Sequence, residues 1–367
     1  MAELLPKDPT LSIAPLGAGD LIDRAVRFYR SHFKTFIFIA APPVILGTIV
    51  SVVWHFAARG LFSVGTRIDP GQQVFYYLFI WVGSAVIWFT ETVATLAVMG
   101  GASRNFVRHL LFDEPISFRA TYRNTWSRLG GLILASSIMT FILGVAGVFI
   151  FYIGLLAALL AVMLVAWTLS AIPIIAFLAS TAFGIAISAV AIWFFFLLAS
   201  RFAYVPQVML VEGQNAFSAI GRSAGIASGN VKRLIALFFF TLLATYSALA
   251  LLYIPLLWYA WVNGIELFGG GNVLPPSIEI LSQLIWQTSF ILLSPVWMVG
   301  LCLLYVDQRV RHEGYDIELA AARRLGDIPD VPADYINPLQ PALSTQKPVE
   351  NDRSSRSESS LTSLGLN

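Results

Sequence analysis

The feature that most constrains this chain is a run of 72 residues, 129–200, without a single Asp, Glu, Lys or Arg. A helix needs about 20 mostly apolar residues to cross a bilayer, because each residue advances it by about 1.5 Å across a core of roughly 30 Å. Four further runs have more than 20 residues: 35–58, 70–104, 234–265 and 280–306. The second of these ends at Arg104 and is interrupted only by Glu91. The sequence therefore predicts an all-α, polytopic bundle of transmembrane helices.

Composition agrees with a membrane protein and excludes several other classes. The chain is 57% hydrophobic and only 12% charged, against about 25% charged in soluble domains. A net charge of +2 gives no reason to expect nucleic acid as a partner. Cys302 is the one cysteine, so no intrachain disulfide forms, and the four histidines lack the paired spacing of a metal site. We expect no metal and no cofactor.

The distribution of Lys and Arg predicts the topology. Of the 23 basic residues, 21 fall in the segments 1–34, 101–129, 201–233 and 307–367, and only Arg59 and Arg67 lie elsewhere. The positive-inside rule places these four segments, and so both termini, on the cytoplasmic side. An even number of helices must then cross within residues 129–200, and two fit, with a bend near Pro173. We expect about six spans, in the cytoplasmic (inner) membrane.

Four regions follow from this topology. Residues 1–34 form an N-terminal cytoplasmic segment with an amphipathic helix, and residues 35–306 form the transmembrane domain. Residues 307–325 are expected as a cytoplasmic helix and motif. Residues 326–367 turn to Pro, Ser, Asn and mixed charge, a composition that cannot bury a core, and we predict a disordered tail.

Three segments share one plan, in which an amphipathic stretch, a polar break and a basic residue precede a span. They are residues 20–34, 115–128 and 215–233. In the first, the charged side chains fall on one side of a helix and the apolar ones on the other. We predict helices lying in the interface at the cytoplasmic side, with the apolar face of the first in the lipid. True duplication and a spacing common to membrane helices both explain the pattern.

Several short motifs carry a resemblance to a known family. They are Leu21-Ile22-Asp23-Arg24-Ala25 with Tyr29-Arg30, then Ser200-Arg201, Pro206, Glu212-Gly213 and Arg222-Ser223, and finally the continuous segment 305–318. Over roughly residues 15–325 the chain resembles the membrane domain associated with bacterial glycerophosphodiester phosphodiesterases, and its stand-alone relatives. The resemblance implies a six-helix bacterial membrane protein. Nothing here resembles that family's catalytic barrel, a separate soluble module, so its enzymatic activity is not expected.

Glu91 is the sharpest anomaly, because a charged residue at mid-membrane costs about 2.5–3.5 kcal/mol on insertion scales. It is either a proton or cation ligand within the bundle or a structural residue that is protonated or paired. Arg201 is a candidate partner if the fourth span runs to Val211, since both residues then lie at comparable depth. If Pro206 ends that span early, Arg201 instead extends to the headgroups.

Two groups of charged residues are expected at the cytoplasmic face. The first is either an ion-pair cluster that clamps the last helix to the interfacial helices or a solvated helix end stopped at Gly314: Glu212, Arg222, Asp307, Arg309, Arg311 and Glu313. The second comprises candidate contacts to anionic lipid headgroups, each worth about 1 kcal/mol: Arg24, Arg27, Arg30, Arg119 and Arg123. General membrane adhesion explains the second group equally well.

These observations favour a non-enzymatic membrane protein that organises lipid, or a protein partner, at the cytoplasmic face. The alternative is a small-solute or ion transporter that uses Glu91. An intramembrane enzyme is disfavoured because the spans offer no paired nucleophile and base. Membrane lipids are the expected partners.

Overall fold

The computed structural model describes residues 17–62, 71–112, 114–227, 229–265 and 275–314. Within these ranges the chain forms ten helices and no strand, so the predicted all-α class is confirmed. Six helices are long and apolar enough to cross a membrane: α2 (Phe33–Leu61), α3 (Gln73–Phe112), α5 (Leu129–Thr168), α6 (Pro173–Phe202), α9 (Val231–Val262) and α10 (Pro276–Glu313). The prediction of six spans is thereby confirmed.

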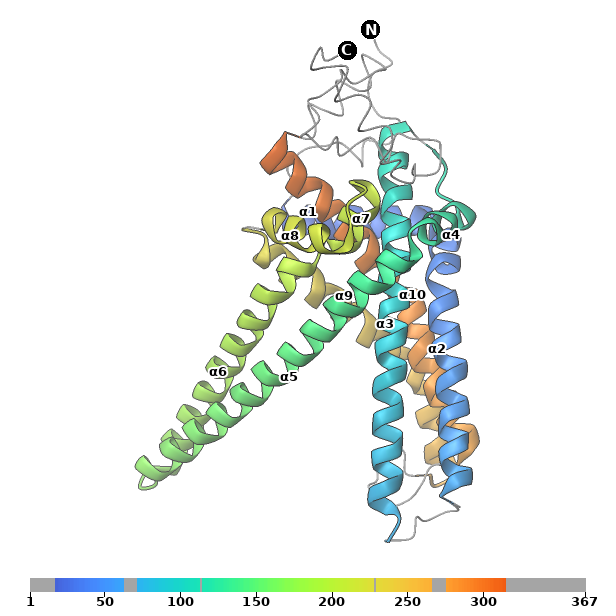
Figure 1. The fold of residues 1–367 in the computed structure, drawn as a ribbon. Helices are drawn as coiled ribbons and strands as arrows, with labels where there is room; N and C mark the ends of the chain where they lie inside the picture. The colour runs from blue at the N-terminus through green and yellow to red at the C-terminus, as the bar shows by residue number, and fades with distance from the viewer. Residues whose placement is uncertain (1–16, 63–70, 113, 228, 266–274, 315–367) are drawn as a thin grey trace, which may run out of the picture.

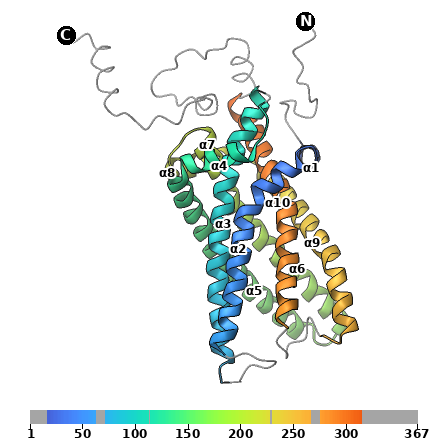
Figure 2. The ribbon, with the colours of Figure 1, turned by 90° about the vertical axis from the view of Figure 1, so that its right-hand side faces the viewer.

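The four short helices gather at one end of the bundle (Figure 1). They are α1 (Ala18–Ser31), α4 (Phe118–Ser127), α7 (Val205–Val211) and α8 (Ala216–Ile226). We call these four helices the collar, and the opposite end of the bundle the distal end. In the view turned by 90°, the long helices still run from the collar to the distal end (Figure 2). The cytoplasmic location of the collar stays a prediction.

The uncharged run 129–200 forms two helices, as predicted. The first ends at Thr168, and the second begins at Pro173 after a turn closed by a hydrogen bond from the amide of Ile172 to the carbonyl of Leu169. Proline suits the first position of a helix, because its missing N–H would have no partner there. Pro173 therefore starts α6, and the predicted bend near it is confirmed.

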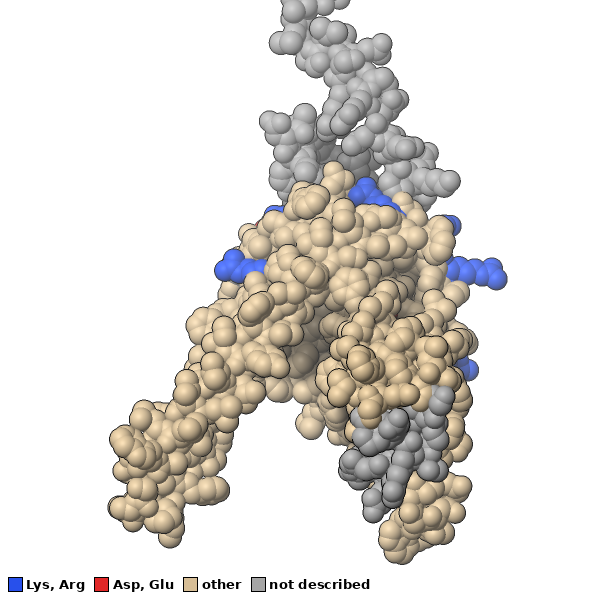
Figure 3. All heavy atoms as spheres, turned by 60° about the horizontal axis from the view of Figure 1, so that its bottom comes forward, with Lys and Arg blue, Asp and Glu red and all other residues tan. Residues whose placement is uncertain are grey.

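The α5–α6 hairpin diverges from the other four spans toward the distal end (Figure 1). Seen from that end, the two arms enclose a hollow, and the α5–α6 arm shows no charged side chain (Figure 3). The buried residues of α5 all lie between Leu132 and Gly147, in the half nearer the collar. The distal half of this helix presents an apolar surface on every side, which is suited to lipid.

The fourth span ends earlier than Val211. Helix α6 stops at Phe202, and the separate helix α7 begins at Val205 with Pro206 in its first turn. Pro206 has no N–H to donate to the carbonyl of Phe202, four residues earlier, and its ring would clash with that carbonyl, so a continuous helix is interrupted after Phe202. Every residue of α7 is buried, which makes this helix the centre of the collar.

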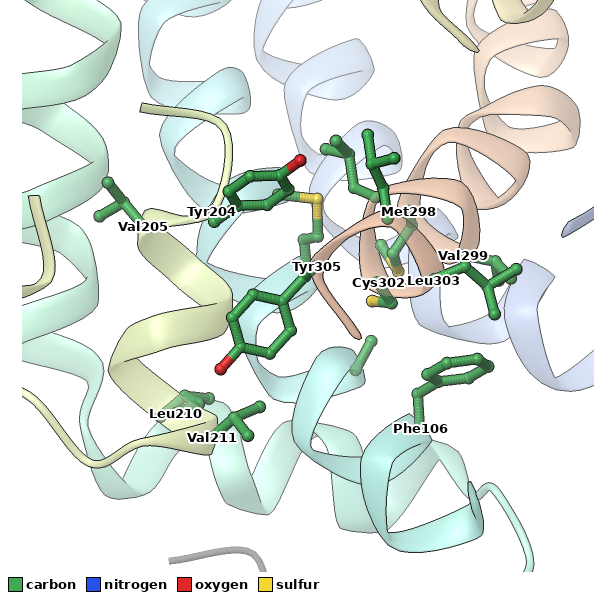
Figure 4. Packing of buried hydrophobic residues seen from close by; sticks show 14 of the residues in the cluster. Phe106, Tyr204, Val205, Leu210, Val211, Met298, Val299, Cys302, Leu303 and Tyr305 are labelled. Atoms are coloured by element: carbon green, nitrogen blue, oxygen red, sulfur yellow. The ribbon is translucent and has the colours of Figure 1, made fainter. Parts of the chain in front are cut away.

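The hydrophobic core lies at the collar and not at mid-membrane. All residues of α10 from Met298 to Arg309 are buried. Tyr305 lies against Tyr204 with ring centroids 6.0 Å apart, and Phe106 belongs to the same cluster (Figure 4). The end of α10 is thus enclosed by protein, whereas the distal spans rely on lipid to cover their apolar surface.

Helix α1 is not placed as predicted for the first interfacial segment. Its apolar residues Leu21, Ala25, Phe28 and Tyr29 are buried, and the helix packs on α10 and α9. The amphipathic helix was predicted from its periodicity, but its apolar face lies against protein and not in lipid. The ends of two apolar spans offer that face a surface to which it packs closely, and such packing gains dispersion contacts that fluid lipid matches less well.

Two tyrosines of the collar donate hydrogen bonds to span carbonyls that lie three or four residues before a proline. Pro43 has no N–H, so the carbonyl of Ile39 loses its helical donor, and the hydroxyl of Tyr122 donates to that carbonyl at 3.0 Å. The hydroxyl of Tyr29 donates to the carbonyl of Leu292, 2.6 Å away and three residues before Pro295. These bonds attach α4 to α2 and α1 to α10.

A close helix contact joins α3 to α4 at Gly101. A Cβ placed on Gly101 would lie 2.2 Å from Oγ1 of Thr125 and 2.5 Å from the backbone oxygen of Thr121. Both distances are far below van der Waals contact, so only glycine permits this approach. Asn105, one helical turn away, donates to the carbonyl of Ser117 at 3.0 Å and to the hydroxyl of Thr121 at 3.1 Å.

We predict that Gly101→Ala destabilises the protein by about 1–3 kcal/mol, because α4 must shift to admit the methyl group. The measurement is denaturant or thermal unfolding in detergent. Gly130→Ala is the matched control, since nothing lies within 4 Å of a Cβ added there. Equal stability of the two variants would contradict the packing described for α4.

Candidate functional site

The charged residues that the sequence placed at the cytoplasmic face form a buried network in the collar. Glu212 follows α7, Arg222 lies in α8, and Arg309 and Glu313 lie in the last turns of α10. Nε of Arg222 donates to Glu212 at 2.9 Å, and Nε of Arg309 donates to Glu313 at 2.9 Å. Arg222 also pairs with Glu313, and Nε of Arg309 lies 3.7 Å from Glu212. We call these four residues the Glu212 network.

Burying the charges of the Glu212 network costs free energy. Arg309 is 0% exposed and Glu212 is 3% exposed. Moving a single ion out of water costs several kcal/mol even after relaxation, and paired charges offset this only with good geometry and further hydrogen bonds. Here two carboxylates face two guanidinium groups, and the hydroxyl of Tyr305 donates to Glu212 at 2.8 Å. The charges balance, and the network joins α10 to α7 and α8.

A second pair of contacts involves Asp307, which is 4% exposed. Nε of Arg311 donates to Asp307 at 2.8 Å, and Arg233 at the start of α9 pairs with the same carboxylate. Asp307 and Arg311 were expected in one cluster with Glu212, whereas the structure places them on a separate side of α10. Arg233 was not among the candidates, although its position as the basic residue before a span was visible in the sequence.

The pKa values of the collar arginines reflect their surroundings. Burial would lower the pKa of Arg222, but the carboxylates of Glu212 and Glu313 outweigh it and raise that pKa above its usual value. Burial lowers the pKa of Arg128, which donates to the backbone carbonyls of Gly213 and Gln214. Arg128 thereby attaches the start of α5 to the turn between α7 and α8.

Four of the five arginines predicted to contact headgroups are exposed at the collar: Arg27, Arg30, Arg119 and Arg123. The fifth, Arg24, is half-buried. Arg27 pairs with Asp23 at 2.5 Å across an exposed helix face, a type of pair that contributes about 0–1 kcal/mol. The collar therefore presents arginines to the solvent or headgroup region from two helices, α1 and α4.

The structure does not bring Glu91 and Arg201 together, which corrects the predicted pair. The side chain of Glu91 hydrogen-bonds to that of Gln287 in α10 and lies against Gly47 of α2. Arg201 is exposed near the end of α6. The two helices diverge, because α6 leaves the bundle with α5, and the early end of α6 places Arg201 beside the collar.

Comparisons with known proteins do not assign this chain to a family. No family model, no curated protein and no solved structure matches the chain. The resemblance to the phosphodiesterase-associated membrane domain therefore stays a prediction. Within the described residues, no group of three or more His, Cys, Asp or Glu side chains could hold a metal ion. The collar's geometry is suited to binding through exposed charge on a rigid support.

Breaking the Glu212 network from one side is expected to leave a buried charge without its partner. We predict that Arg309→Met and Glu212→Gln each cost about 3–5 kcal/mol of unfolding free energy. The double variant should cost less than the sum, by about 0.5–3 kcal/mol. Asp23→Asn, which removes an exposed pair, is the control and should change stability by under about 1 kcal/mol. Strict additivity of the two buried substitutions would show that they do not interact.

Tyr29 and Tyr122 should make the free energy of unfolding fall at high pH. Burial raises the pKa of each to about 12 from the ordinary value of 10.0. Between these values the unfolded chain has lost both protons while the folded chain retains them, so stability decreases as pH rises from 10 through about 12. Unfolding in detergent should follow this course, and the Tyr29→Phe/Tyr122→Phe variant should lose stability less steeply. An unchanged slope in that variant would contradict the assignment.

Proposed function

We propose that this multi-pass membrane protein is not an enzyme and that its collar binds anionic lipid headgroups at the cytoplasmic face of a bacterial inner membrane. The observation that supports the proposal is the set of four exposed arginines on α1 and α4, at the end of the bundle where the spans meet the membrane surface. Arginine suits phosphate because its planar fork can donate two hydrogen bonds to two oxygens.

Exposed aromatic side chains of the collar support the same location. Trp126 in α4 is 72% exposed and Phe217 in α8 is likewise 72% exposed. Tryptophan is enriched at the boundary between hydrocarbon and headgroups, and an exposed Phe gains free energy by inserting there. Insertion of these rings brings the collar to the depth of the lipid phosphates, where each exposed arginine adds about 1 kcal/mol of attraction to an anionic leaflet.

Rigid attachment favours organisation of lipid over loose adhesion. Helix α4 is fixed by the Gly101 contact and by the bond from Tyr122 to Ile39. Helix α1 is fixed by its buried face and by the bond from Tyr29 to Leu292. The backbone of such supports loses little further entropy on binding, so the entropic cost is limited to the arginine side chains, about 0.5–1.5 kcal/mol each. The arginines can then hold headgroups at defined positions.

The test is lipid retention by the protein reconstituted into nanodiscs of phosphatidylcholine and phosphatidylglycerol. We expect the variant with Arg27→Gln, Arg30→Gln, Arg119→Gln and Arg123→Gln to retain less phosphatidylglycerol after partial delipidation, as counted by native mass spectrometry. The loss should be largest at low salt, since exposed charges are screened beyond about 10 Å at 0.1 M ionic strength.

The matched control replaces the same four residues by lysine. If charge alone attracts the lipid, the lysine variant retains as much phosphatidylglycerol as the wild type, and if the guanidinium fork matters, it retains an intermediate amount. Equal retention by the wild type and the glutamine variant would overturn the proposal and leave a protein partner as the occupant of the collar.

A further inference from the structure

A row of polar side chains runs from the distal end of the bundle toward its middle. On α10, Glu279, Gln283 and Gln287 are spaced four residues apart and so lie on one face of the helix. Each has a polar partner on a neighbouring span. Glu279 pairs with Arg59 of α2 at 2.7 Å, Gln283 donates to Ser51 of α2, and Gln287 bonds to Glu91 of α3. We call these six residues the polar row.

The outer part of the polar row has room for water. A small cavity of about 10 Å³ lies between α2 and α10, close to the roughly 10–15 Å³ that one water molecule requires. Its polar lining consists of His55, Arg59, Glu279 and Gln283. A site with several hydrogen-bonding groups and this volume is the kind that holds an ordered water.

Glu91 lies at the inner end of the polar row. It is 18 residues from each end of the apolar span Gln73–His109, or roughly 27 Å of helix in either direction. Its carboxylate rests on α2, where a Cβ added to Gly47 would lie 2.6 Å from one of its oxygens. Glycine at position 47 thus leaves the space that the carboxyl group occupies.

No ion pair compensates Glu91 within the described residues. From α10 it meets Gln287, and from α2 it meets Gly47. The other titratable groups of these three helices lie on both sides of Glu91 along the chain. Toward the distal end they are His55, Arg59, Tyr76, Tyr77 and Glu279, and toward the collar they are Lys34, Arg104, Arg108, His109, Cys302, Tyr305 and the charged residues of α10 from Asp307 to Glu313. Helix α5 carries no charged residue, and α4 and α7 lie in the collar. A carboxylate here would have only an amide to stabilise its charge, so proton binding offers a large gain.

We propose that Glu91 is a proton-binding carboxyl group that exchanges its proton with water at the distal end through the polar row. A proton delivered by water adds to a carboxylate oxygen and gives the neutral acid, and its loss returns the carboxylate. Gln287 serves both states, because its amide N–H donates to the carboxylate and its amide oxygen accepts from the protonated acid.

The proton is a better occupant than a metal cation. Calcium takes six to eight oxygen ligands, and magnesium requires near-ideal octahedral geometry. Glu91 and Gln287 together offer few side-chain oxygens, and among the described residues no group of three or more His, Cys, Asp or Glu side chains could hold a metal ion. This inference does not depend on lipid binding by the collar. It supplies the site that an ion transporter would need, although proton binding does not require transport.

The first arm of the test uses the full chain in proteoliposomes with dicyclohexylcarbodiimide, a membrane-soluble reagent that modifies protonated carboxyl groups. We expect modification of Glu91, located by peptide mass spectrometry, that decreases as the pH is raised. Glu279 is the internal control and should stay unmodified, because its carboxylate is engaged in an ion pair with Arg59. Glu91→Gln should abolish the modification. No modification at any pH, or modification independent of pH, would overturn the proposal.

The second arm tests the route to water. Ser51→Cys and Gln283→Cys should react with a small, water-soluble thiosulfonate. Val50→Cys and Leu284→Cys lie at matching depths on exposed, lipid-facing positions and should react far more slowly, because a thiol in hydrocarbon does not ionise. Native Cys302 is buried and serves as the background. Equal reactivity of the two sets would show that no water path follows the polar row.

Discussion

The position of Arg309 is the constraint on which the arrangement of the collar depends. Its guanidinium group is inaccessible to solvent, so it must be paired or the folded state would carry an isolated buried charge. One partner, Glu313, is on the same helix, but the other, Glu212, comes from the junction that follows α7. Arg222 of α8 completes the balance of charge. The end of α10 can therefore be enclosed only when α7 and α8 are in place.

The two ends of the molecule are stabilised in different ways. At the collar, buried tyrosines, ion pairs and close glycine contacts fix the short helices to the spans. Toward the distal end, the α5–α6 hairpin has few protein neighbours, and its apolar side chains need none in a bilayer. Lipid acts as the solvent for these surfaces, which allows the hairpin to diverge without exposing polar backbone. The polar row places hydrogen-bonding side chains between α2, α3 and α10, and Tyr253 and Ser289 form hydrogen bonds between α9 and α10.

Much of this architecture follows from the sequence. The uncharged run 129–200 and the segregation of Lys and Arg were sufficient to predict six spans and the bend before Pro173. Amphipathic spacing predicted α1, but periodicity reports that a helix has an apolar face and not what covers it. The expected pair of Glu91 and Arg201 failed because depth in the membrane does not determine which helices are neighbours. The polar row was not predicted either, although the four-residue spacing of Glu279, Gln283 and Gln287 is visible in the sequence.

The collar and the end of α10 form a single packed unit. Hydrogen exchange of the reconstituted protein, followed by mass spectrometry, measures this most directly, because elements that open together exchange together. The structure predicts that amides of α1, α7 and α8 are protected to the same degree as those of residues 301–309 in α10. Rapid exchange of α1 and α8 while the end of α10 stays protected would contradict it, since these helices would then be loosely attached to the membrane surface.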